Sequence, residues 1–136
     1  MISLNNLTPL TKENLEELGW YIADIINMDW TFKFHIISKE VMKEIAGDAG
    51  CYAVWASNDN FKIATIYVNG EKEYCDDETW ELSVIHEMIH VVYADLDLYL
   101  RSQYKELNDN KFYEALKERM VEHFAKSLYE LVKDKS

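Results

Sequence analysis

Two histidines and one glutamate near the middle of the chain have the types and spacing needed to bind a metal ion and to activate water. His86 and His90 lie one helical turn apart, so their imidazole nitrogens can reach a single ion. Glu87 lies one step round the helix, where its carboxylate can hold a water molecule and accept a proton from it. These residues predict a metal site with a general base beside it.

The segment that carries these residues is predicted to be a largely buried helix. Residues 80–92 contain no Gly or Pro, and their apolar side chains recur at helical spacing. Buried histidines usually form hydrogen bonds within a core. Here, however, two of them flank a glutamate in an otherwise aliphatic helix, where unpaired polar groups are costly. This setting favours a bound ion, and we expect one Zn²⁺ per chain.

A zinc ion held by two histidines needs a third protein ligand and an open fourth position. A third histidine just after the motif is excluded, because Tyr93 and Leu96 stand where metzincins have Gly and His. The other common solution is a glutamate from a later helix. Glu118 is the predicted ligand, and Glu122, one turn further on, is predicted to orient a ligand imidazole. Glu114 precedes Glu118 at the same spacing, so it stays an alternative.

The two motifs resemble those of a known class of zinc peptidases. The sequence HEMIH at residues 86–90, followed by ERMVEHFA at residues 118–125, is similar to the gluzincins. It looks most like the small single-domain, often prophage-associated members related to the ImmA/IrrE-like metallopeptidases. The resemblance covers roughly residues 30–132. It implies a zinc-dependent peptidase, a hydrolase with a peptide or protein substrate and Glu87 as its general base.

Two places depart from that family's pattern. Ile89 stands where many relatives have Gly, and Val121 and Glu122 replace a small residue followed by Asn or Asp. The second departure bears on the third ligand, so Glu118, Glu122 and Glu114 all stay candidates.

Composition limits the partners. The chain has 136 residues, 49% of them hydrophobic, and we expect residues 1–136 to form one domain. A formal net charge of −11 argues against a nucleic-acid surface and against binding to a membrane of anionic lipid. Residues 1–6 do not resemble a secretion signal, and Cys51 and Cys75 form no CxxC pair. We therefore expect a cytoplasmic protein with reduced thiols.

The predicted fold is α+β and zincin-like, with a small antiparallel three-stranded sheet packed on about three main helices. The HExxH motif would lie on the middle helix and the third ligand on the C-terminal helix. Alternation of apolar and polar residues predicts strands at residues 30–37, 51–56 and 61–68. By the resemblance, the strand at residues 63–68 borders the cleft, and its free edge pairs with an extended substrate.

Capping residues and apolar periodicity predict the helices. Thr11 is the predicted N-cap of a helix over residues 12–27, in which Trp20 belongs to the core or its rim. Asp76 or Asp77 is the predicted N-cap of the motif helix. The last helix is predicted over residues 111–133, with an apolar side formed by Leu116, Met120, Phe124, Leu128 and Leu131.

Three other functions compete with peptidase activity. The first is a zinc-binding regulatory or interaction domain with little or no hydrolytic activity. The second is a metal-free scaffold that binds a partner through its acidic surface. The third, a DNA-associated SprT-like protease, is disfavoured because the chain lacks a basic surface and a Cys-rich zinc ribbon. Metal content and hydrolytic activity separate the first two from a peptidase.

Overall fold

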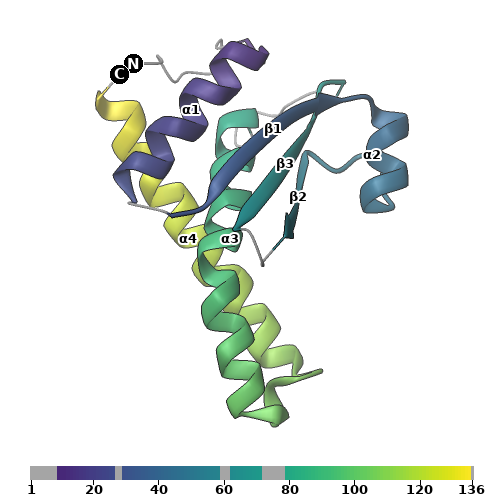
Figure 1. Cartoon of the computed structure of the whole chain (residues 1–136), viewed down its shortest axis with the longest axis vertical. Helices are drawn as coiled ribbons and strands as arrows, with labels where there is room; N and C mark the ends of the chain where they lie inside the picture. The colour runs from purple at the N-terminus through teal and green to yellow at the C-terminus, as the bar shows by residue number, and fades with distance from the viewer. Residues whose placement is uncertain (1–8, 27–28, 59–61, 72–78, 136) are drawn as a thin grey trace.

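A computed structural model describes residues 9–26, 29–58, 62–71 and 79–135. Short helices and strands make up the first part of the chain, and two long helices make up the rest (Figure 1). This confirms the α+β class. The elements are α1 (Lys12–Ile25), β1 (Thr31–Ile37), α2 (Lys39–Ala46), β2 (Ala53–Asn58), β3 (Ile63–Asn69), α3 (Trp80–Gln103), the 3₁₀ helix η1 (Lys105–Leu107) and α4 (Lys111–Lys135).

The sheet is mixed, so the predicted all-antiparallel sheet is wrong. Its strand order is β1-β3-β2, with β3 antiparallel to β2 and parallel to β1. A parallel pair needs a crossover connection, and here the chain from β1 passes through α2 and β2 before β3 returns beside β1. β3 is therefore the inner strand. The expectation that residues 63–68 offer a free edge is also wrong.

The core lies between the sheet and the long helices. α1 and α3 cover one face of the sheet, and the second half of α4 packs against them (Figure 1). Every second residue of β3 points into this core, and Ala64, Ile66 and Val68 are fully buried. α1 approaches β1 closely because residue 19 is Gly: a Cβ there would lie 2.1 Å from Cζ of Phe34.

α1 begins where predicted. The hydroxyl of Thr11 accepts a hydrogen bond from the backbone N–H of Asn14 at 3.1 Å, which confirms the N-cap. The helix ends at Ile25, and the predicted last residue, Asn27, lies outside the described residues. Trp20 lies on the surface, with 68% of its area exposed, and not in the core.

α3 and α4 form a helical hairpin that extends beyond the sheet (Figure 1). α3 is capped by Thr79, whose hydroxyl accepts a backbone N–H of the first turn. The predicted caps Asp76 and Asp77 lie outside the described residues. Although these two helices are long, no helix in the described parts of the chain is both long and apolar enough to cross a membrane.

The buried side of α4 differs in part from the predicted one, since Leu128 is half-buried and packs against the core but the other four predicted residues are more exposed. Leu116, Met120, Phe124 and Leu131 keep 39% to 56% of their area exposed. For Leu116 and Met120 the reason is that the first half of α4 extends past the sheet and packs against α3, which covers only part of its apolar arc. The buried side chains of α4 are Tyr113, Val121, Ala125, Tyr129 and Val132.

Glu81 is a buried carboxyl group in the first turn of α3. The residue is 1% exposed, and its Oε1 has no hydrogen-bond partner among the described residues. Burial raises the pKa of Glu81 from 4.5 to about 6, although hydrogen bonds from its own backbone and from Thr79 act in the opposite direction. The folded state therefore binds this proton more tightly than the unfolded chain. Its stabilising effect is complete below pH 4.5 and is lost as the pH rises through 6.

We predict that Glu81→Gln raises the free energy of unfolding at neutral pH by about 2 kcal/mol, because the amide carries no charge to bury. Urea denaturation at about pH 7 and about pH 5 measures this, and the gain should be less than half as large at the lower pH. Glu130→Gln, a change at an exposed glutamate of α4, serves as the control and should have little effect. An equal gain at both pH values would contradict the prediction.

Candidate metal site

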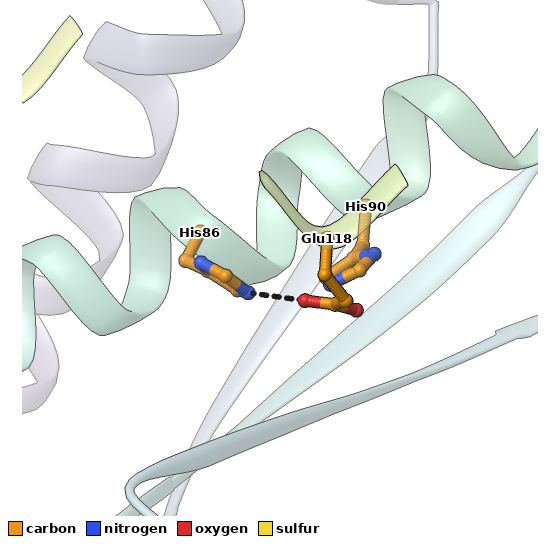
Figure 2. A group of neighbouring side chains, drawn as sticks. All are labelled: His86, His90 and Glu118. Carbon is orange, nitrogen blue, oxygen red and sulfur yellow. Dashed lines mark ion pairs between the residues drawn. The ribbon is translucent and has the colours of Figure 1, made fainter. Parts of the chain in front are cut away.

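α3 presents His86 and His90 on the side that faces α4. The opposite side of the helix packs on the core, where Ile85 and Met88 are fully buried, and this packing determines how the helix is rotated. The two imidazole centroids lie 4.9 Å apart. Their Nε2 atoms both approach one carboxylate, which comes from α4 (Figure 2).

Glu118 supplies that carboxylate. Its Oε1 lies 3.0 Å from Nε2 of His90, and its Oε2 lies 3.6 Å from Nε2 of His86 (Figure 2). Ligand atoms bound tetrahedrally to zinc at about 2.0 to 2.1 Å are about 3.4 Å from one another. The two observed distances are near this value but end on different oxygens of Glu118, and one ligand atom from each residue lies within 4.8 Å of the others. His86, His90 and Glu118 therefore form a group that could hold a metal ion.

One side of this group faces solvent. The side chain of Glu118 is 54% exposed, whereas those of His86 and His90 are 26% and 15% exposed. Burial lowers the pKa of His90, although the charge of Glu118 opposes this shift. A lowered pKa favours the neutral imidazole, which is the form that binds metals. The arrangement thus combines partly buried imidazoles with a carboxylate that is accessible to solvent.

Glu87 lies at the wall of a pocket beside the group. The pocket has a volume of about 390 Å³, and both His86 and Glu87 line it. Burial, and to a smaller extent the charge of Glu118, raises the pKa of Glu87 to about 8. A cation bound by the group would oppose this shift. Pocket residues that the sequence motifs did not indicate include Tyr52, Ala53 and Lys126.

Glu114 and Glu122, the two alternative ligands, have other partners. Glu114 pairs with Arg101 and, at 3.1 Å, with Lys117. Glu122 lines the pocket and pairs with Lys126 at 3.0 Å. Within the described residues, the glutamate that joins the two histidines is the one predicted as the third ligand.

A polar network joins α3 to α4 near the site. Asp97 accepts hydrogen bonds from the Tyr113 hydroxyl and from Arg101, and its other oxygen lies 3.5 Å from Lys117. Burial alone would raise the pKa of Asp97, but these hydrogen bonds and charges outweigh burial and hold the pKa below its usual range. The network links the two helices that carry His86, His90 and Glu118. Sequence reasoning missed it, although the spacing of Asp97 and Arg101 is that of a helical ion pair.

Comparisons of the chain with protein-family models, with curated proteins and with solved structures found no match. The function must therefore be inferred from the site itself.

We predict that Asp97→Asn lowers the free energy of unfolding by about 2 kcal/mol, because Arg101 and Lys117 lose a partly buried counter-charge. Asp97 stabilises the fold above its unfolded pKa of 3.8, so the loss should shrink as the pH falls through that value. Urea denaturation measures the change. Asp95→Asn, at an exposed position of the same helix, should stay within about 0.5 kcal/mol of the wild type. Equal losses in the two variants would contradict a specific role for Asp97.

Proposed function

We propose that this protein is a zinc-dependent peptidase with a zincin-like fold, in which His86, His90 and Glu118 hold the zinc. The main support is the convergence of two imidazoles and one carboxylate, from two helices, with one ligand atom of each residue within 4.8 Å of the others. Two His and one Glu form a common ligand set of catalytic zinc sites, in which the fourth position is open. The exposure of Glu118 is consistent with such an open position.

Glu87 is the general base of the proposed reaction. Zinc, when bound, supplies a Lewis acid that polarises a peptide carbonyl and lowers the pKa of water. The carboxylate of Glu87 takes a proton from the attacking water and passes it to the leaving amine. Its position at the wall of the pocket suits this transfer, because a substrate bound in the pocket would lie beside it.

The edge available to an extended substrate belongs to β2. The backbone N–H of Asn69 donates to the carbonyl of Tyr52 at 2.8 Å, so the alternation of backbone groups turns those of Ala53 and Trp55 away from β3. Among the described residues, no strand pairs with this outer edge. Because Ala53 also lines the pocket, a peptide paired with β2 would pass close to Glu87.

We predict that the wild-type chain, purified without added metal, carries about one zinc per chain and that His86→Ala carries very little. Glu118→Gln should also lose most of its zinc. Glu122→Gln is the matched control, because it changes a glutamate one turn away on the same helix, and it should keep the metal. Elemental analysis measures the zinc content. Absence of zinc from the folded wild type would reject the metal site and favour the metal-free scaffold.

We predict that Glu87→Gln keeps its zinc but cleaves unfolded protein at least about 100-fold more slowly, as expected for the loss of a general base. The assay follows release of soluble fragments from a fluorescently labelled, unfolded protein, and Glu130→Gln serves as the control with unchanged activity. If wild type and Glu87→Gln, both loaded with zinc, show the same background, the peptidase proposal is wrong. The chain would then be a zinc-binding regulatory or interaction domain.

A further inference from the structure

A second hollow lies at the other edge of the sheet from the candidate metal site. It has a volume of about 240 Å³ and lies between α1 and β1, which we call the α1–β1 groove. α1 contributes Lys12, Glu16 and Trp20, which share one side of the helix. β1 contributes residues 32–35. Because consecutive strand residues point to opposite faces, a hollow lined by four in a row opens onto the edge of the strand.

The backbone of β1 presents hydrogen-bonding groups to this groove. The N–H of Thr31 donates to the carbonyl of Lys62 at 2.9 Å, so every second residue from 31 onward faces β3. The residues between them, Phe32 and Phe34, must turn their N–H and C=O groups outward. Among the described residues, these outward groups have no hydrogen-bond partner. β1 thus carries an unpaired edge along the groove.

The side of the groove toward α1 is apolar. The rings of Phe32 and Phe34 lie 6.1 Å apart on this side, and Trp20 is 68% exposed beside them. The contact of Gly19 with the Phe34 ring fixes how close α1 lies to the strand. The hollow is therefore bounded by packed elements on both sides, and within the described parts of the chain most of the Trp20 surface is exposed.

The other side of β1 is polar. Lys33 and His35 point to the open face of the sheet and are exposed, and His35 stacks on Tyr67 at 5.7 Å. The charged residues that line the groove are Lys12, Lys33 and Glu16, so positive side chains outnumber negative ones there. The whole chain, in contrast, has a formal net charge of −11. Charges farther away than about 8 Å are largely screened at physiological salt, so these local lysines decide which charges are favoured.

We propose that the α1–β1 groove binds an extended segment of a partner protein, which adds to the sheet as a strand beside β1. A polypeptide is the ligand whose alternating N–H and C=O groups match the unpaired edge. Side chains of neighbouring strands lie next to each other on the same face. Segment residues on the α1 side therefore contact Trp20 and are apolar, and those on the open side meet Lys33 and are acidic.

The partner is a different protein and not a second copy of this chain. Two β1 edges that paired antiparallel about Lys33 would bring the Lys33 side chains of both copies together, and lysine on an edge strand commonly prevents such pairing. An acidic residue opposite Lys33 removes this repulsion. The site is separate from the proposed peptidase site, so its test does not depend on zinc or on hydrolysis.

Hydrogen exchange tests whether the edge is free and whether it can be filled. In the dilute free protein, the amides of Phe32 and Phe34 should exchange faster than those of Lys33 and His35, because the backbone N–H groups of Lys33 and His35 face β3. The test peptide has about six residues, which is an ordinary strand length, and alternates Val and Glu. It should slow exchange at Phe32 and Phe34. Protection of these two amides in the free protein would overturn the proposal. So would unchanged exchange at about 1 mM peptide, near the weak limit of specific binding.

Fluorescence anisotropy of the labelled peptide tests the contact with α1. Trp20→Ala should weaken binding about tenfold, as expected for an aromatic anchor. Phe112→Ala removes an aromatic residue that is 73% exposed at the start of α4, and it should leave binding unchanged. A copy of the peptide methylated on alternate amide nitrogens should not bind, because it cannot donate to β1. Equal weakening by both variants, or binding of the methylated copy, would overturn the proposal.

A charge swap tests the open side of the strand. The wild type should prefer the Val–Glu peptide to a peptide that alternates Val and Lys, and Lys33→Glu should reverse this preference. A merely structural effect of the substitution would weaken both peptides alike. An unchanged order of the two affinities would show that Lys33 does not face the bound segment and would refute the proposed orientation.

Discussion

The register of α4 against α3 is the constraint on which the candidate metal site depends. His86 and His90 lie on α3 and Glu118 lies on α4, so no local structure sets the distance between the histidines and the glutamate. One residue of slippage along a helix is about 1.5 Å, which is enough to take the Glu118 carboxylate out of the range that one ion can bridge. Asp97, through Tyr113 and Lys117, opposes such slippage from the distal part of the hairpin.

The rotation of α3 is determined separately, by the core. Val84, Ile85 and Met88 are fully buried, and they leave His86 and His90 on the side toward α4 and Glu87 at the pocket. These polar side chains therefore replace no core contact. The cost of placing them there is confined to partial desolvation, which is visible in the lowered pKa of His90 and the raised pKa of Glu87.

The parts of the structure that follow from local spacing could be predicted from the sequence, and those that depend on distant packing could not. The helical spacing of His86 and His90 predicted their shared face, whereas the spacing of the three glutamates made Glu118 the preferred ligand but left Glu114 and Glu122 open. The direction of β3 relative to β1 depends on how the chain crosses the sheet, which alternation of side chains does not encode. The pocket wall formed by Tyr52 and Ala53 depends on the same topology.

The prediction of which apolar residues of α4 are buried was wrong for a related reason. Its exposed and buried faces both carry large apolar residues, so periodicity alone could not choose between them, and Tyr113 and Tyr129 are buried despite their hydroxyl groups. The choice is made by where the hairpin leaves the sheet, and this is a property of the whole fold. Trp20 is the opposite case, because its apolar side chain stays exposed where a helix borders an unpaired strand edge.

The inner position of β3 shields the stretch of the chain most prone to aggregation. Residues 63–68 are uncharged, contain no Pro or Gly, and are rich in β-branched and aromatic side chains, a composition typical of amyloid-forming segments. In the folded protein both of their edges are hydrogen-bonded, to β1 and to β2, so they cannot template the stacking of other molecules. This stretch is accessible to intermolecular stacking only in unfolded chains. Self-association through residues 63–68 therefore competes with the folding reaction.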